Sequence, residues 1–325
     1  MNEKIPGHNN FLIVGCGELG SRHAQSLSRL GTDVSLSLVD PSEESLLKTK
    51  MRILEGGFSG KMTFHESTEN LAGEFELGIF STSATHRLDS FRKAYSGAMF
   101  SSVLLEKILS LDSEELDFYD SRTIGGEVGS WVNLPMPYYG HFKREEGEIM
   151  HNSKASPLKY HVLGSNLGLV TNFIHYLDHF QRLCHDRKLT VRFSEASRKI
   201  ESKRSGYQEL LGKIEARTVE GDELSVLFKD ELAEPFLEIT ISTGDLVWKF
   251  DEINGVLTKH NLIADSKVSH YKTPFQSELT HISVQRIRRN LSPFWCELKR
   301  ATALHRRLDE ALDPIRKRLG ALKFT

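Results

Sequence analysis

Along the first third of the chain, short apolar runs alternate with stretches whose apolar residues recur at a helical period. Apolar runs typical of strands occupy residues 11–14, 34–40, 61–65, 77–80 and 102–106. Helical periods follow the first run and recur over residues 41–54 and 86–95. This alternation extends to about residue 122 and predicts a doubly wound parallel sheet, which binds its ligand at the carboxyl ends of the strands.

The pattern changes after Gly125 and Gly126, where the apolar runs become alternating and turn-punctuated. They cover residues 128–133, 159–163, 213–218, 224–229, 236–242 and 246–250, and predict a mostly antiparallel sheet. Helices are predicted over residues 167–183, 278–289 and 293–319, with a break or restart at Asp313-Pro314. We therefore expect a Rossmann dinucleotide-binding domain over residues 1–123. An α+β domain should follow over residues 124–325, ending in helices over 278–320.

Three glycines follow the first predicted strand in G-x-G-x-x-G spacing and open the first predicted helix. Gly15 suits a tight turn, Gly17 a close approach to a pyrophosphate, and Gly20 the packing of helix against strand. Glycines also serve ordinary turns, so the triplet alone is weak. Asp40 strengthens it, because it ends the next strand, where a carboxylate accepts ribose hydroxyls and repels a 2′-phosphate. The motif therefore favours NAD over NADP.

Composition narrows the classes of function. The 325 residues are 39% hydrophobic and 26% charged, with a formal net charge of −2, so no global field favours nucleic acid or an anionic membrane. Cys16, Cys184 and Cys296 form neither a disulfide framework nor a zinc spacing. Residues 1–10 lack the apolar region of a signal peptide, and no apolar run approaches bilayer length. We expect a cytoplasmic protein.

Lys107 directly follows the apolar strand that ends at Leu105. A lysine at this edge of the sheet could hold a substrate oxygen and stabilise developing alkoxide charge beside the nicotinamide. The alternative is a solvated lysine paired to Glu106, and its place on the cofactor side favours the functional interpretation.

The predicted helix over 167–183 carries a polar face beside its apolar stripe. His175, Asp178 and His179 lie three or four residues apart there, together with Thr171 and Asn172. A carboxylate three residues from a histidine can orient the ring and raise its pKa for general acid–base work. An amphipathic helix that merely carries histidines is the alternative. A metal held by His175 and His179 is disfavoured because no third ligand is evident.

Aromatic and amide side chains cluster over residues 131–139. Asn133 and Tyr138 could line a sugar-like ligand through amide hydrogen bonds and stacking. The segment could equally close a strand and pack at a domain seam, so both interpretations stay open.

Taken together, these motifs resemble the Gfo/Idh/MocA family of NAD(P)-dependent oxidoreductases over nearly the whole chain. The resemblance lies in the glycine motif with Arg22-His23, Ser81-Thr82, Leu105-Glu106-Lys107 and His175-x-x-Asp178. It implies a Rossmann domain joined to an α+β domain whose large open sheet often mediates homo-oligomerisation, as a dimer or tetramer. It also implies that Lys107 and His175 assist hydride transfer at a sugar or polyol carbon. Members associated with surface-polysaccharide and unusual-sugar biosynthesis are the most similar.

Two positions depart from the family pattern. Ile108 stands where the family has proline, and Thr171 where many members have an acid. They favour the alternative of an NAD-binding sensor or scaffold with the same fold. The expected catalytic residues are Lys107, His175 and Asp178. The residues expected to contact the cofactor are Gly15, Gly17, Glu18, Leu19, Gly20, Asp40, Ser81, Thr82, Ser83 and Glu106. Those expected to contact a sugar substrate are Asn133, Tyr138, Asn172 and His179.

Overall fold

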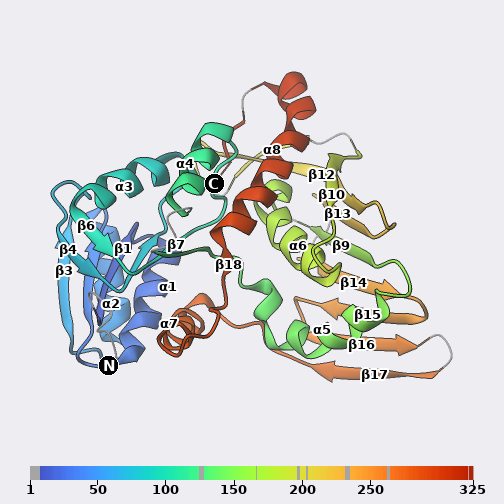
Figure 1. The fold of residues 1–325 in the computed structure, drawn as a ribbon, viewed down its shortest axis with the longest axis horizontal. Helices are drawn as coiled ribbons and strands as arrows, with labels where there is room; N and C mark the ends of the chain where they lie inside the picture. The colour runs from blue at the N-terminus through green and yellow to red at the C-terminus, as the bar shows by residue number, and fades with distance from the viewer. Residues whose placement is uncertain are drawn as a thin grey trace. The chain divides into compact units, whose positions relative to one another are not determined.

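The computed structural model describes residues 8–123, 128–165, 167–195, 198–202, 204–230, 235–261, 264–320 and 322–324. The chain divides into two compact units (Figure 1). Unit 1 comprises Met1–Asn133 and Pro274–Thr302, and unit 2 comprises Leu134–Thr273 and Ala303–Thr325. The segment Pro274–Thr302 therefore returns to the N-terminal unit, whereas the sequence pattern places every residue beyond 123 in the second domain.

Unit 1 alternates strands and helices as its apolar pattern predicts. Its strands are β1 (Asn10–Val14), β2 (Ser35–Val39), β3 (Lys61–His65), β4 (Gly73–Phe75), β5 (Leu77–Phe80), β6 (Ala98–Phe100), β7 (Ser102–Leu105), β8 (Gly129–Val132) and β18 (Cys296–Glu297). Its helices are α1 (Glu18–Leu27), η1 (Ser28–Leu30), α2 (Glu43–Leu54), α3 (Ala84–Gly97), α4 (Ser113–Thr123), η3 (Gln276–Glu278) and α7 (Thr280–Arg288), and α8 (Leu298–Leu319) begins here.

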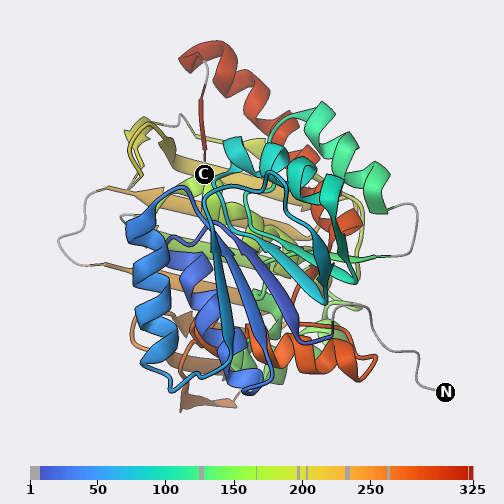
Figure 2. The same ribbon diagram turned by 90° about the vertical axis from the view of Figure 1, so that its left-hand side faces the viewer.

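Within the described residues, the main sheet of unit 1 has the order β18-β8-β7-β5-β1-β2-β3. All neighbouring strands are parallel except β18, which runs antiparallel to β8. Figure 2 shows the blue strands β1 and β2 side by side, with blue helices along them. Apolar side chains of this sheet pack with those of α1, α2 and α7; they include Phe11, Ile13, Ala24, Ile53 and Val284. The predicted Rossmann-like parallel sheet is confirmed.

Strand β8 corrects one prediction. The sequence pattern places residues 128–133 in the antiparallel sheet, but β8 pairs in parallel with β7, matching Val132 to Leu105. The strand-helix-strand alternation therefore continues through α4 for one more step. Gly125 and Gly126, where the pattern changes, lie outside the described residues.

Unit 2 contains the predicted large, mostly antiparallel sheet. Its strands are β9 (Lys159–Ser165), β10 (Leu189–Phe193), β11 (Arg198–Glu201), β12 (Gln208–Thr218), β13 (Glu223–Lys229), β14 (Leu237–Thr243), β15 (Leu246–Asp251), β16 (Val256–Asn261) and β17 (Ala264–His270). Among described residues the order is β10-β12-β13-β9-β14-β15-β16-β17, with β11 on β12, and only β9 and β13 pair in parallel. The helices η2 (Met136–Tyr138), α5 (Gly140–Asn152) and α6 (Leu169–Leu183) belong to this unit.

One face of this sheet is buried and the other is more exposed. On β9, Tyr160 and Val162 are buried, whereas Lys159 and His161 are exposed, as strand periodicity requires. Helix α6 packs against β12 and β13, and α5 packs against β14. The predicted helix over 167–183 is thus confirmed, whereas α5 was missed.

The predicted break at Asp313-Pro314 is wrong, because α8 continues through Pro314 to Leu319. Leu312 and Ile315, on either side of the proline, are both buried. The Nη1 of Arg316 lies 3.4 Å from the carbonyl oxygen of Asp309. Continuous packing on both sides therefore outweighs the hydrogen bond that proline removes.

Candidate functional site

The turn between β1 and α1 shows why its three glycines are needed. Gly15 has φ of +90°, and a Cβ on it would lie 2.7 Å from the amide nitrogen of Thr82. A Cβ on Gly20 would lie 1.8 Å from the carbonyl oxygen of Gly15, so this helix position packs directly on the turn. A Cβ on Gly17, in contrast, would meet nothing within 4 Å. The turn is closed at Gly15 and Gly20 and open at Gly17, as a phosphate cradle requires.

Anion-binding donors accompany this opening. Helix α1 starts at Glu18, and its N-cap Gly17 makes no side-chain capping hydrogen bond. The first-turn amides of a helix have no acceptor within the helix and, with the helix dipole, favour a bound anion. Glu18 and Leu19 are exposed on this turn, and Glu18 forms ion pairs with Lys48 (2.9 Å) and Arg52 (3.0 Å).

Asp40 lies beside the glycine turn. Its Oδ2 accepts a hydrogen bond from the amide of Cys16 (2.7 Å), and its Oδ1 accepts one from the amide of Ser42 (2.9 Å). These bonds orient the carboxylate, and an ionised carboxylate has further lone pairs for hydroxyl donors. Burial, reinforced by the charge of Asp40, raises the pKa of Cys16 to about 12, so its thiol stays protonated.

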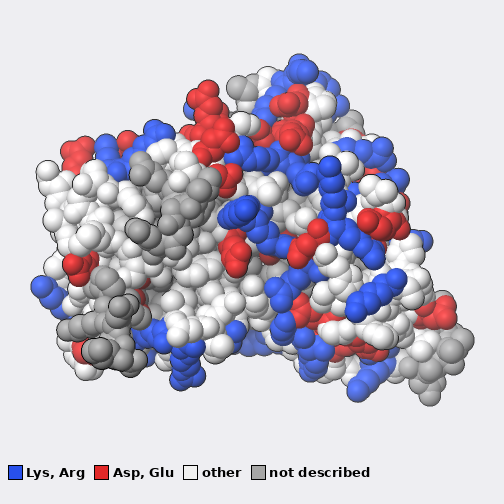
Figure 3. Space-filling model, in the orientation of Figure 1, with Lys and Arg blue, Asp and Glu red and all other residues white. Residues whose placement is uncertain are grey.

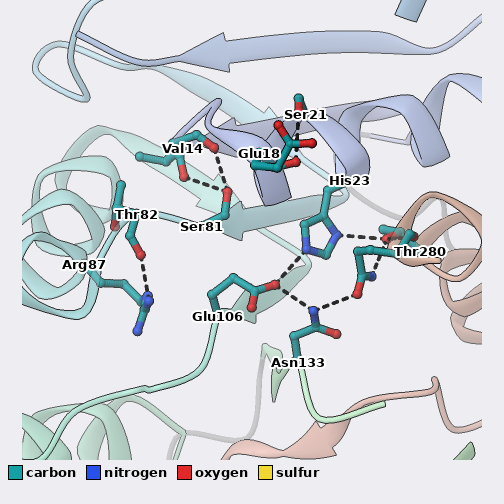
Figure 4. A network of polar contacts seen from close by, with 12 residues as sticks. Val14, Glu18, Ser21, His23, Ser81, Thr82, Arg87, Glu106, Asn133 and Thr280 are labelled. Carbon is teal, nitrogen blue, oxygen red and sulfur yellow. Dashed lines mark hydrogen bonds and ion pairs between the residues drawn. The ribbon is translucent and has the colours of Figure 1, made fainter. Parts of the chain in front are cut away.

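Ser81, Thr82 and Ser83 follow β5, and the first two lie against the same turn (Figure 4). The hydroxyl of Ser81 donates to the carbonyl oxygens of Gly15 (2.7 Å) and Val14 (3.2 Å), so it supports the turn from behind. The carbonyl oxygen of Thr82 accepts a hydrogen bond from Arg87. The Ser83 hydroxyl lies 3.3 Å from that of Thr85.

A closed ring of side-chain hydrogen bonds links the helix of the glycine turn to the ends of β7 and β8 (Figure 4). Glu106 Oε1 lies 2.8 Å from His23 Nε2 and 2.7 Å from Asn133 Nδ2. Asn133 Nδ2 also donates to Gln276 Oε1 (2.9 Å). Gln276 Nε2 then donates to Thr280 Oγ1 (3.0 Å), which lies 2.8 Å from His23 Nδ1.

Donor counting gives this ring a consistent direction. If His23 carries its proton on Nε2, it donates to the Glu106 carboxylate and accepts from the Thr280 hydroxyl. His23 and Glu106 are 0% and 2% exposed, so the ring satisfies polar groups that would be costly to bury alone. The Asn133 amide is 4% exposed and serves this ring.

Lys107 follows Glu106 at the carboxyl end of β7 and is half-buried. The peptide bond between Lys107 and Ile108 is cis. The carbonyl oxygens of Ile108 and Leu109 both accept hydrogen bonds from the guanidinium of Arg87. The expected catalytic lysine therefore lies on a segment held by a buried arginine.

In unit 2, helix α6 divides the expected polar face into two parts. Asn172 and His175 are half-buried, as is Thr171, whereas Asp178 and His179 are buried. The Asn172 amide donates back to the carbonyl oxygen of Gly168 (2.7 Å).

A carboxylate from β12 caps the start of α6. Glu209 accepts hydrogen bonds from the amides of Val170 (3.1 Å) and Thr171 (3.2 Å). Burial raises the pKa of Glu209, although these bonds and one from the Thr171 side chain oppose the rise. An acid therefore lies beside the turn that carries Thr171, one helical turn before His175.

His179 is 1% exposed, and its Nδ1 lies 3.0 Å from the hydroxyl of Tyr160. Its ring lies 4.7 Å from that of Phe142. Burial, with smaller effects from nearby Arg182 and His141, lowers the pKa of His179 to about 3, so the imidazole is neutral. This placement favours packing over substrate contact.

Tyr138 lies on η2 and is covered by Arg182 of α6. The guanidinium is 5.1 Å from the centre of the tyrosine ring and pairs with Glu146. Burial alone would lower the pKa of Arg182, but the hydrogen bond and the charge of Glu146, together with Tyr138, outweigh that effect and raise it. The guanidinium of Arg182 therefore lies over the tyrosine ring while its charge is paired with a carboxylate.

Some residues around the site were missed by sequence reasoning. Arg87, Glu209, Gln276, Thr280 and Arg182 carried no local signal, because each acts through a residue distant in the sequence. No described helix has the length and apolar character needed to cross a membrane. No cluster of three or more His, Cys, Asp or Glu side chains within the described ranges is arranged to hold a metal ion.

The fold defines a class: a Rossmann-like parallel-sheet unit combined with a large, mostly antiparallel sheet, as the resemblance to the Gfo/Idh/MocA family implies. No protein-family model and no curated protein sequence matches the chain.

Solved structures share this fold over nearly the whole chain. UDP-N-acetylglucosamine 3-dehydrogenase GnnA from Acidithiobacillus ferrooxidans has a TM-score of 0.68 at 15% identity, over 93% of this chain and 95% of that one. A super-repressor mutant of Gal80p from Saccharomyces cerevisiae has a TM-score of 0.70 at 14% identity, over 96% of both chains. An NAD binding oxidoreductase from Klebsiella pneumoniae has a TM-score of 0.64 at 11% identity, over 93% of this chain and 95% of that one.

Proposed function

We propose that this protein is an NAD-dependent oxidoreductase that transfers a hydride between nicotinamide and a sugar or sugar derivative. The observation that carries the proposal is the glycine turn, which is closed at Gly15 and Gly20 and open at Gly17. The open side leads to the first-turn amides of α1, and Asp40 lies beside it. Phosphates and a ribose are the groups that such an arrangement binds.

We infer a preference for NAD over NADP from Asp40. Its carboxylate is held at the end of β2 by the Cys16 and Ser42 amides, where it would accept ribose hydroxyls and repel a 2′-phosphate. Fluorescence titration should give a lower Kd for NADH than for NADPH, and Asp40→Ala should narrow the gap by about 1–3 kcal/mol. Equal affinities in the parent protein would contradict this preference.

Lys107, His175 and Asp178 are the residues to which we assign the chemistry. NAD, when bound, supplies the hydride acceptor. The Lys107 ammonium would hold the substrate oxygen and stabilise its developing negative charge. The imidazole of His175 would take the hydroxyl proton, and Asp178 would orient that ring.

Single-turnover kinetics test this assignment. Lys107→Met should lower kcat by about 10²-fold or more, and His175→Ala by about 10²–10⁴-fold, with NAD affinity nearly unchanged. Values of kcat within about twofold of the parent for both variants would rule out the roles. Tight NAD binding without hydride transfer from any sugar tested would instead favour the sensor or scaffold alternative. The family resemblance leads us to expect an acid where Thr171 stands. The carboxylate of Glu209 accepts a hydrogen bond from the Thr171 amide, so an acid lies beside that position, which supports the enzyme over the sensor.

The substrate class is also a proposal. Tyr138 and Asn172 remain our candidates for contacting the sugar, and Asn133 and His179 are weaker candidates because both are buried. One solved structure of the same fold is a UDP-N-acetylglucosamine dehydrogenase, so nucleotide-linked sugars are the first compounds to assay. A role in surface-polysaccharide biosynthesis follows from the sequence resemblance alone.

We also propose a cytoplasmic homo-oligomer that associates through the exposed face of the unit 2 sheet. That face carries cross-strand ion pairs such as Lys249–Glu238 (2.7 Å) and Arg192–Glu215 (3.2 Å). On the face drawn in Figure 3, acidic and basic side chains are interspersed, which does not favour nucleic acid as a partner. Light scattering would contradict the oligomer if the protein remained monomeric at micromolar concentration.

A further inference from the structure

Arg87 is a buried charge whose hydrogen bonds reach two loops at the carboxyl edge of the unit 1 sheet. It lies on α3 and is 1% exposed. Its Nη1 donates to the carbonyl oxygens of Ile108 and of Leu109 (3.2 Å), and its Nη2 donates to that of Thr82 (2.7 Å). Figure 4 shows Arg87 below Thr82, and Thr82 belongs to the chain that leaves β5.

These bonds join the chain after β7 to the chain after β5. Ile108 and Leu109 are the two residues after Lys107, so the guanidinium holds the backbone from which the lysine side chain departs. Thr82 adjoins the glycine turn, where its amide nitrogen lies against Gly15. A planar guanidinium can donate to several fixed carbonyls at once, whereas a lysine ammonium is a single point with three rotatable donors.

Burying a charge is costly, and a buried arginine bonded to backbone carbonyls contributes little that an apolar side chain could not supply by packing. Its specific effect is to fix the positions of those carbonyls. We propose that Arg87 is a positioning residue that holds Lys107 in place relative to the end of β5. The inference rests on the proposed function only for the role of Lys107, because the restraint on the loop is independent of turnover.

Arg288 offers a matched control in the same unit. Its guanidinium forms a bidentate pair with Glu76 (2.6 and 2.8 Å) and also donates to Asn9 (2.6 Å). Glu76 and Asn9 immediately precede β5 and β1, so Arg288 acts at the amino ends of these strands, whereas Arg87 acts beyond the carboxyl ends of β5 and β7. Arg288→Met should therefore disturb unit 1 without releasing the Lys107 segment.

The experiment compares Arg87→Met, Arg87→Lys and Arg288→Met with the parent by two readouts. Hydrogen exchange followed by mass spectrometry reports the amides of residues 107–110. Acetic anhydride labelling at several pH values, quantified on the Lys107 peptide, reports the reactivity of the lysine amine. Both readouts use the folded protein without substrate.

We expect Arg87→Met to speed exchange over 107–110 by about tenfold or more and to change Lys107 labelling at least about threefold, relative to Arg288→Met. Arg87→Lys should change exchange and labelling to an intermediate extent. If Arg87→Met does not fold, Arg87→Lys is compared with Arg288→Met instead. In hydride transfer, kcat should fall while the Kd for NADH stays within about threefold. If Arg87→Met shows the same exchange rate and the same Lys107 labelling as Arg288→Met, the inference is overturned, even if the parent protein transfers hydride. A clear effect on both in a protein that transfers no hydride would leave the restraint standing and remove the proposed function instead.

Discussion

Two alanine substitutions in the glycine turn should affect different properties. Gly20→Ala should mainly lower the stability of the fold, and Gly17→Ala should mainly weaken the binding of NADH. In Gly20→Ala, the new Cβ would lie 1.8 Å from Gly15 O and 2.9 Å from Gly15 C, so α1 must move away from the turn. Overpacking of this kind costs about 1–3 kcal/mol, of which the better helix propensity of alanine returns up to about 1 kcal/mol. A loss of a few degrees in Tm is expected.

In Gly17→Ala, the Cβ meets nothing within 4 Å, and the backbone (φ −65°, ψ −160°) lies in the extended region that alanine adopts freely. Replacing a glycine N-cap with alanine costs about 1 kcal/mol at most. The methyl group would fill the space that we assign to the pyrophosphate. The Kd for NADH should therefore rise at least about tenfold, equivalent to about 1.4 kcal/mol.

NADH fluorescence titration and thermal unfolding would be measured on both variants and on Gly140→Ala. Gly140 is the first residue of α5 in unit 2, and a Cβ added there would also meet nothing within 4 Å, so this control should change neither quantity. If Gly17→Ala binds NADH within about twofold of the parent, the turn is not the phosphate cradle. If Gly17→Ala lowers Tm as much as Gly20→Ala does, the packing argument fails.

Substitutions at three further residues test the polar contacts. Thr280→Val should lower the urea midpoint by the equivalent of about 1–3 kcal/mol, because His23 Nδ1 loses its buried partner. Thr280→Ser keeps the hydroxyl and should recover most of that stability. Equal urea midpoints for the parent and Thr280→Val would contradict the hydrogen-bonded ring. Burial raises the pKa of Asp222, but hydrogen bonds, including one from Arg187, outweigh it and lower the pKa below 3.8. Its stabilisation is therefore present above pH 3.8 and lost as the pH falls through the folded-state pKa, so Asp222→Asn should flatten the acid limb of urea unfolding. Glu209 has the opposite sign: with its pKa raised above 4.5, stability should rise as the pH falls toward 4.5, and Glu209→Gln should lack this rise in thermal unfolding.

Local signals were sufficient to predict much of this molecule. The glycine spacing and the apolar runs predicted β1, the turn and α1. The helical period over residues 41–54 predicted α2, which the hydroxyl of Ser42 caps by accepting from the amide of Ser45 (3.2 Å). The apolar stripe of α6, including Phe173 and Ile174, is fully buried as its period predicts. These features depend on residues within one or two helical turns of one another.

Contacts between residues far apart in the sequence could not be predicted. Nothing near Lys107 indicates that Arg87 holds its loop, and nothing near Thr171 indicates the Glu209 carboxylate from β12. The parallel pairing of β8 was missed because the alternation of apolar and polar residues within a strand does not indicate which strand it pairs with. Pro314 misled because local helix propensity is a weak guide where tertiary packing continues.

The discontinuity of unit 1 sets an order of events during synthesis. When Asn133 has left the ribosome, every strand of the parallel sheet except β18 is available. Gln276 and Thr280 emerge only after roughly 150 more residues have been synthesised. At about 5–20 residues per second, that delay is roughly 7–30 s. Until then His23 and Glu106 must remain hydrated or find temporary partners, and unit 2 has time to begin folding. A nascent chain stalled before residue 274 should therefore hold NADH less tightly than one released beyond residue 302.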